Sequence, residues 1–113
     1  MEENNINEQQ NNNAKQVITN YEHNKGNNYV IPYVNIEGYE IQNINNEIQG
    51  IANRDDVNST SYTYCIKDDV VSLLYTANIK NSDKQEKYTY NFDKSENKVL
   101  SNTELLEELN IYV

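Results

Sequence analysis

The fold is decided by residues 59–93, which read STSYTYCIKDDVVSLLYTANIKNSDKQEKYTYNFD. In this stretch apolar and aromatic residues recur at alternate positions, in three successive runs. The runs are Tyr62, Tyr64 and Ile66; then Val71, Leu73, Tyr75, Ala77 and Ile79; and then Tyr88, Tyr90 and Phe92. A period of two is typical of a strand with one covered face and one solvated face.

Residues with turn chemistry separate the three runs. Asp68 and Asp69 divide the first run from the second, and the segment 81–84, reading NSDK, divides the second from the third. Asn, Asp and Ser favour turns because their short polar side chains can hydrogen-bond to the nearby backbone. The stretch therefore predicts an antiparallel meander of three strands.

The period of the apolar residues changes in the segment before the meander. Ile41, Ile44, Ile48 and Ile51 are spaced three, four and three residues apart, which places them on one face of a helix over residues 39–53. One interpretation is a helix that binds a partner. We favour a helix that covers the apolar face of the meander, because that face needs a lid.

Two further elements flank this helix and meander. Residues 28–36, reading NYVIPYVNI, predict a first strand, and Pro32 favours an edge position or a bulge because proline removes a ladder donor. Ser101 with Glu104 three residues later forms a capping-box pattern. The leucines that follow, Leu105, Leu106 and Leu109, predict a short amphipathic C-terminal helix.

The sequence thus predicts an α+β domain over residues 27–113, in the order strand, helix, three strands, helix. Its antiparallel sheet, an edge strand plus the meander, is covered by one amphipathic helix. Residues 1–26 are expected to form a disordered Asn-rich tether, since the first 28 residues contain ten Asn and few apolar residues. The alternative for residues 14–21 is a short helix with Val17, Ile18 and Tyr21 on one face.

Charge and cysteine content limit the possible partners. The net charge of -9 and the absence of a Lys/Arg cluster argue against a nucleic-acid partner, while an acidic surface can attract a cationic one. The single Cys65 cannot form an internal disulfide, and we expect a half-buried thiol in the first meander strand. No run approaches the roughly 20 apolar residues of a membrane span.

The residues needed for known catalytic constellations are missing. The chain has one His, His23, and one Cys, so the sequence predicts no metal site, no cofactor and no catalytic residue. Two acidic pairs, Asp55 with Asp56 and Asp68 with Asp69, fit turns, and calcium binding or acid–base chemistry is the alternative for them.

Ten tyrosines are the one unusual surplus. A tyrosine ring can pack while its hydroxyl hydrogen-bonds, which suits both cores and binding surfaces. Most tyrosines of the meander share the alternation of the covered face and are expected in the core. Tyr29, Tyr33 and Tyr39, on and after the predicted edge strand, are the candidate binding surface.

Three segments together carry a resemblance to a known family. They read IPYVNIEGYEIQNINNEIQGIAN, SYTYCIKDDVVSLLYTANI and KYTYNFDKSENKVLSNTELLEEL. The proline-containing strand, the helix with Ile41, Asn45 and Ile48, and the YTYNFD ending of a strand resemble the module ahead of the catalytic domain in PdaC-type peptidoglycan deacetylases. The same module is similar to the outer region of the anti-sigma factor RsiV.

This resemblance implies a non-catalytic, extracytoplasmic module of a Gram-positive cell envelope. If the protein is exported, its export signal is expected to lie upstream of this sequence or to have been cut away. The deacetylase activity of that family belongs to a separate metal-binding domain, so no catalytic residue is carried over. The expected partner is a cell-wall glycan or a wall-acting protein. The alternative is an acidic sensor or inhibitor domain that recognises a cationic protein such as lysozyme, as the RsiV likeness suggests.

Overall fold

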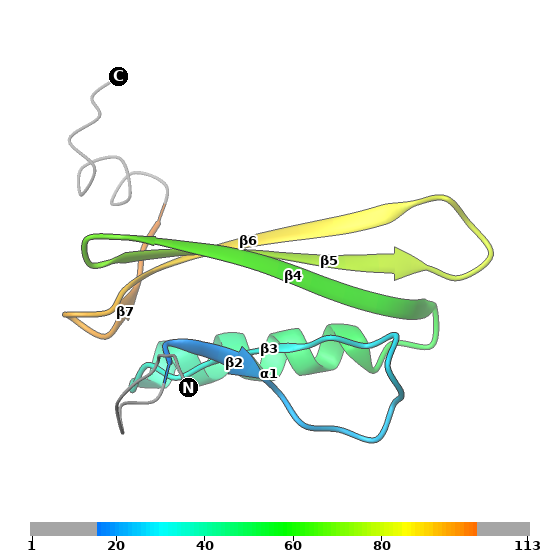
Figure 1. Cartoon of the computed structure of the whole chain (residues 1–113), viewed down its shortest axis with the longest axis horizontal. Coiled ribbons are helices and arrows are strands. Elements are labelled where there is room, and N and C mark those ends of the chain that lie inside the picture. Colours follow the sequence, from blue (N-terminus) through cyan, green and yellow to red (C-terminus); the bar gives the residue numbers. More distant parts are fainter. Residues whose placement is uncertain (1–15, 102–113) are drawn as a thin grey trace, which may run out of the picture.

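The structure, a computed structural model, describes residues 16–101 and belongs to the α+β class. Its elements in chain order are β2 (Ile18–Asn20), β3 (Pro32–Val34), α1 (Tyr39–Ala52), β4 (Val57–Lys67), β5 (Val70–Ile79), β6 (Gln85–Asp93) and β7 (Lys98–Val99) (Figure 1). Strands β4, β5, β6 and β7 form one antiparallel sheet in that order. The predicted class, an antiparallel sheet covered by one amphipathic helix, is confirmed.

The predicted meander forms the centre of the sheet. Strand β5 pairs along its length with β4 on one side and with β6 on the other. Lys67 pairs with Val70, so Asp68 and Asp69 alone make the first turn. Asp68 has φ 55°, a left-handed conformation that Asp tolerates better than most residues. The acidic pair therefore serves the turn, as the sequence indicates.

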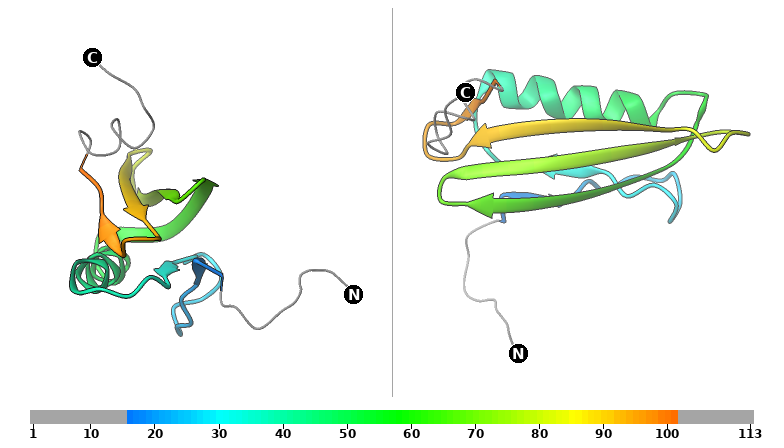
Figure 2. Two further views of the ribbon diagram at one scale, coloured as in Figure 1. Left: turned by 90° about the vertical axis from the view of Figure 1, so that its left-hand side faces the viewer. Right: turned by 90° about the horizontal axis from the view of Figure 1, so that it is seen from above.

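One face of the sheet is covered and the other faces solvent. Helix α1 and the β2–β3 ribbon lie side by side beneath the sheet (Figures 1 and 2). The covered face contributes Val71, Leu73, Tyr75, Ala77 and Phe92, each at most 2 % exposed. The alternation along β5 and β6 thus correctly identifies the core side.

Helix α1 packs through its isoleucine stripe. Ile41, Ile48 and Ile51 are buried, and Ile44 is partly buried against the same core. The prediction that the stripe covers the meander is confirmed. The helix begins after Gly38, whose φ of 134° is unfavourable for other residues.

Asn45 occupies the middle of this stripe and is 1 % exposed. Its Oδ1 accepts a hydrogen bond from the Val34 amide at 2.8 Å, and its Nδ2 donates to the Val34 carbonyl at 3.0 Å. One side chain therefore satisfies both main-chain groups on the helix-facing edge of β3. Strand β2 pairs with the opposite edge of β3.

Two predictions for the first 36 residues are wrong. Ile18–Asn20, which lie within the predicted tether, form strand β2 rather than a helix, and Ile18 is 2 % exposed in the core. The predicted strand 28–36 shortens to Pro32–Val34 and joins β2 rather than the main sheet. Its only bridge to that sheet within the described residues joins Tyr29 to Thr60 in parallel.

The C-terminal end of β4 is more exposed than predicted, because the sequence predicts that one whole face of the meander is covered. Tyr64 is 38 % exposed and Ile66 is 46 % exposed, although both share the face of buried Leu73 and Val71. Cys65 is exposed, not half-buried, because it lies on the solvated face of an edge strand. The predicted C-terminal helix at 101–109 lies outside the described residues except for Ser101.

Candidate binding face at the β2–β3 loop

The connection from Tyr21 to Ile31, which joins β2 to β3 (Figure 1), lines two adjoining hollows. A hollow of about 460 Å³ and a second of about 320 Å³ share the loop residues Tyr21, Glu22, His23 and Ile31. The larger is lined in addition by Asn20, Gly26, Asn27, Tyr29 and Val30, and the smaller by Asn24, Lys25, Gln49 and Asn53.

The loop is fastened to strand β4. The Thr60 amide donates to the Asn28 carbonyl at 3.1 Å, and the Val30 amide donates to the Thr60 carbonyl at 3.1 Å. The Thr60 hydroxyl donates to the Val30 carbonyl at 3.0 Å, and the Tyr29 hydroxyl donates to the Val57 carbonyl at 2.9 Å. These four bonds hold one wall of the larger hollow against the sheet.

His23 orders the tip of the loop. The Lys25 amide donates to His23 Nδ1 at 3.0 Å, so that nitrogen is the acceptor. Nε2 lies 2.6 Å from the Tyr29 carbonyl and therefore carries the proton of the neutral imidazole. The ring meets Tyr29 edge-on at 6.5 Å, and Lys25 Nζ lies 4.9 Å from the centre of the same tyrosine ring.

Tyr21 provides an accessible aromatic surface beside both hollows. Its side chain is 37 % exposed, and its ring stacks on Tyr33 at 6.1 Å with the planes inclined by 22°. The Tyr33 hydroxyl donates to Gln42 Oε1 at 3.2 Å, which fixes the lower ring of the stack. A flat aromatic face next to amide groups is suited to binding a ligand that needs both stacking and hydrogen bonds.

The three tyrosines predicted as a binding surface lie in different surroundings. Tyr29 lines the larger hollow and is partly buried against the core. Tyr33 lies beneath Tyr21 in the stack. Tyr39 is 83 % exposed at the beginning of α1, outside both hollows. Tyr21 and His23 were not among the predicted site residues, because the Asn-rich composition around them suggested a tether.

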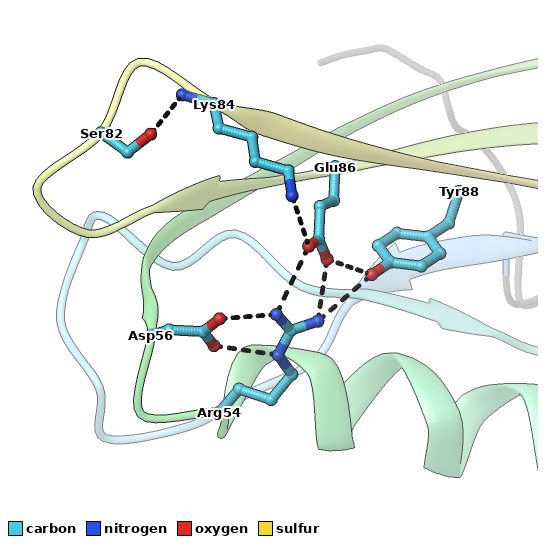
Figure 3. A network of polar contacts seen from close by, with 6 residues as sticks. All are labelled: Arg54, Asp56, Ser82, Lys84, Glu86 and Tyr88. Carbon is cyan, nitrogen blue, oxygen red and sulfur yellow. Dashed lines mark hydrogen bonds and ion pairs between the residues drawn. The ribbon is translucent and has the colours of Figure 1, made fainter.

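A cluster of polar side chains follows the C-terminal end of α1 and connects it to the sheet (Figure 3). Arg54 makes a double hydrogen bond to Asp56, at 3.0 and 2.8 Å, and an ion pair with Glu86 at 2.8 Å. The Tyr88 hydroxyl donates to the same Glu86 carboxylate at 2.5 Å. The cluster joins the end of α1 to β6. Its two carboxylates, those of Asp56 and Glu86, already bond to Arg54 and Tyr88 rather than being open to a metal cation.

The pKa values of this cluster follow from its hydrogen bonds. Arg54, through its hydrogen bonds, lowers the pKa of Asp56 and of Glu86 below their ordinary values. The same carboxylates raise the pKa of Arg54. The hydrogen bond to Glu86 raises the pKa of the Tyr88 hydroxyl, so this group resists ionisation. No member is poised to exchange protons near neutral pH.

Two further tyrosine hydroxyls fasten the sheet to α1. Tyr75, fully buried, donates to the Ile48 carbonyl at 3.1 Å, and Tyr90 donates to the Glu47 carboxylate at 2.5 Å. Burial raises the pKa of Tyr75 to about 12, and burial together with Glu47 raises the pKa of Tyr90. These tyrosines act as packing residues with a polar anchor.

The two acidic pairs lie at opposite ends of β4, so they do not converge in one cleft. Among residues 16–101 no three His, Cys, Asp or Glu side chains are grouped so that they could hold a metal ion. In the same range no helix is long and apolar enough to cross a membrane. The β2–β3 loop, which lines two adjoining hollows with aromatic and amide groups, is the candidate site, and its groups suit binding.

Comparison of the chain with models of protein families, with curated proteins and with solved structures finds no match. The resemblance to the PdaC and RsiV modules stays a prediction from the motifs quoted above. The function has to be inferred from the chemistry of the loop.

Proposed function

We propose that the chain is a non-catalytic binding module whose β2–β3 loop binds a glycan of the bacterial cell wall. The observation that carries the proposal is the lining of the two adjoining hollows. It combines the aromatic rings of Tyr21 and Tyr29 with the amides of Asn20, Asn24, Asn27, Gln49 and Asn53. Sugars need this combination, since their C–H faces pack on aromatic rings and their hydroxyls hydrogen-bond to amides.

The charges of the hollows support a ligand of low charge. Glu22 and Lys25 are the charged residues among the side chains that line them, and they have opposite signs. A phosphate-rich ligand would need several Lys or Arg side chains in the lining, and a strongly basic peptide would need several carboxylates there. The proposed location in a Gram-positive envelope, outside the membrane, rests on the resemblance to the PdaC and RsiV modules alone.

The test is a titration of the labelled protein with soluble muropeptides and chito-oligosaccharides, followed by amide correlation spectra. We expect shifts in residues 20–31, 49 and 53. Tyr21→Ala should weaken binding about ten-fold, because it removes one stacking surface of about 1–1.5 kcal/mol. Tyr39→Ala is the matched control, since it removes an exposed ring outside the hollows and should leave binding unchanged. If no glycan shifts the loop signals, this function is wrong.

A second candidate is recognition of a cationic protein through α1. Within residues 27–53 the charged residues are Glu37, Glu40 and Glu47, all exposed, and Tyr39 lies among them. A surface with charges of one sign attracts the opposite sign in a salt-dependent way. Binding of lysozyme that Glu40→Gln weakens and that salt abolishes would favour this candidate; salt-independent binding would count against it.

A further inference from the structure

Strand β4 has one edge that is only partly covered. Its first edge pairs with β5 from Val57 to Lys67. Its second edge is met by the loop segment 28–30, which bonds to Thr60. Beyond Thr60 this second edge has no partner within the described residues, and Thr63 to Lys67 are exposed.

The direction of each main-chain group on β4 follows from its hairpin. Lys67 and Val70 close a two-residue turn, and such a closing pair exchanges hydrogen bonds. Odd-numbered residues of β4 therefore bond to β5, and even-numbered residues point away from it. Thr60, an even-numbered residue, confirms this alternation, because its amide and its carbonyl both bond to the loop on the side away from β5. The amides and carbonyls of Tyr62, Tyr64 and Ile66 thus form an open row.

The side chains of β4 do little to protect this edge. Natural edge strands are usually shielded by proline, a bulge or inward charges. The segment 60–67, TSYTYCIK, contains no proline and no carboxylate, and Lys67 is its only charge. Tyr64 and Ile66 expose apolar surface beside the open row, and the Tyr62 and Tyr64 rings stack at 6.3 Å.

We propose that a second copy of this chain pairs with β4 along this open row, antiparallel and about a two-fold axis at Tyr64. Each Tyr62 then lies opposite Ile66 of the second copy, and Tyr64 lies opposite its own counterpart. The three pairs exchange about six main-chain hydrogen bonds. The two four-stranded sheets become one continuous sheet.

Two features of β4 favour a second copy over an unrelated strand. The open row has three outward residues and is closed at Thr60 by the loop, so its centre is Tyr64 and a two-fold pairing uses all of it. The facing side chains are also compatible: aromatic and aliphatic residues meet in one row, and each Lys67 faces Ser61 of the second copy. No carboxylate of the strand faces another, despite the net charge of -9.

The register can be tested by disulfide trapping in a Cys65→Ser background. At the axis, Tyr64→Cys places two Cα atoms about 5.5 Å apart, within the range that a disulfide spans. Tyr62→Cys is the matched control, since its counterpart lies four residues away along the strand, about 14 Å. We expect a covalent dimer from the first variant, none from the second, and a heterodimer when Tyr62→Cys and Ile66→Cys proteins are mixed. Equal trapping of both single variants would overturn the proposal.

Non-covalent association is measured on the unmodified protein by sedimentation and by hydrogen exchange as a function of concentration. We expect dimer formation, with the Tyr62, Tyr64 and Ile66 amides gaining protection as the concentration rises. Tyr64→Lys puts two cations at the axis and should weaken the dimer at least ten-fold while leaving the folded spectrum intact. A monomer at about 1 mM, with these three amides exchanging freely, would overturn the proposal. Tyr64→Lys leaves the β2–β3 loop unchanged, so glycan binding is tested separately.

Discussion

Asn45 shows how one polar side chain can determine the position of a whole strand. Its amide group satisfies both main-chain groups of Val34 in a site closed to solvent. The carboxamide is matched to this task because it presents a donor and an acceptor side by side. The family resemblance was based partly on this residue, and the structure gives it a physical role in this chain.

Replacement of Asn45 should therefore destabilise the protein more than its size suggests. Asn45→Leu leaves the Val34 amide and carbonyl buried without partners, and we expect a loss of about 2–4 kcal/mol in the free energy of unfolding. Asn46→Leu, on the exposed side of the next helical position, is the control and should change it by less than about 0.5 kcal/mol. Urea unfolding of both variants measures the difference; equal values would contradict the role given to Asn45.

Two glycines in the same helix region provide a second comparison. Gly38 has φ 134°, and a Cβ there would lie 3.0 Å from the Asn97 carbonyl oxygen. Gly50 lies inside α1, and a Cβ would meet nothing within 4 Å. We expect Gly38→Ala to cost about 1–3 kcal/mol and Gly50→Ala to stabilise by about 0.5–1 kcal/mol. Thermal unfolding gives the signs, and the same sign for both would contradict this account.

At the scale of elements, the sequence predicts what alternation and spacing encode. The residue period identified the covered face of β5 and the buried side of α1, because burial selects apolar residues at that period. It gave no indication of where the covering layer ends, so exposure of Tyr64 and Ile66 was not predicted. Strand β2 was not predicted, because three residues in an Asn-rich segment are too few to show a hydrophobic period. This strand is held in place by its pairing with β3.

The candidate site was only partly predictable for the same reason. Tyr29 was identified from the surplus of tyrosine, but its partners His23 and Lys25 come from a loop whose composition is typical of unstructured chain. That loop is ordered by contacts with Val57 and Thr60, about thirty residues later in the sequence. Contacts between distant segments of this kind leave no local pattern in the sequence.

The Arg54 cluster joins the end of α1 to β6, and it predicts a response to acid. Asp56 and Glu86 have folded-state pKa values below their ordinary values of 3.8 and 4.5. Between the ordinary and the folded-state pKa values, the unfolded chain therefore binds more protons than the folded one. The stabilisation is complete at neutral pH and is lost as the pH falls from the ordinary values through the lower folded-state values. Arg54→Gln should flatten this part of the curve of unfolding free energy against pH. Lys87→Gln, the same charge change on the solvated face of β6, should not; an equal effect would contradict the assignment.

The tyrosine anchors predict a response to alkali. The pKa of Tyr75 is raised to about 12 and that of Tyr90 is also raised, relative to 10.0 in the unfolded chain. Stability due to these groups is complete below pH 10 and decreases as the pH rises towards their folded-state pKa values. In a titration of tyrosinate absorbance, Tyr90→Phe should remove part of the late-ionising fraction. Ionisation of all tyrosines near pH 10 in the folded protein would contradict the prediction.

For the whole molecule, the net charge of -9 should act against compactness. We expect the free energy of unfolding at pH 7 to rise between about 10 and 150 mM salt, as self-repulsion is screened. The same comparison near the calculated isoelectric point of about 4.4 is the control and should show little change. A fall in stability with salt at pH 7 would mean that attractive ion pairs, such as those of Arg54, outweigh the repulsion.

Thr60 belongs to both surfaces described above, because it bonds to the loop that lines the larger hollow and borders the open row of β4. A ligand that tightens this loop therefore also fixes one end of the pairing edge. Thermodynamic linkage then requires a reciprocal effect: if glycan raises the affinity between two copies by some factor, association raises glycan affinity by the same factor. Thr60 would in that case couple glycan binding to association, so that several copies would bind one polymeric glycan cooperatively.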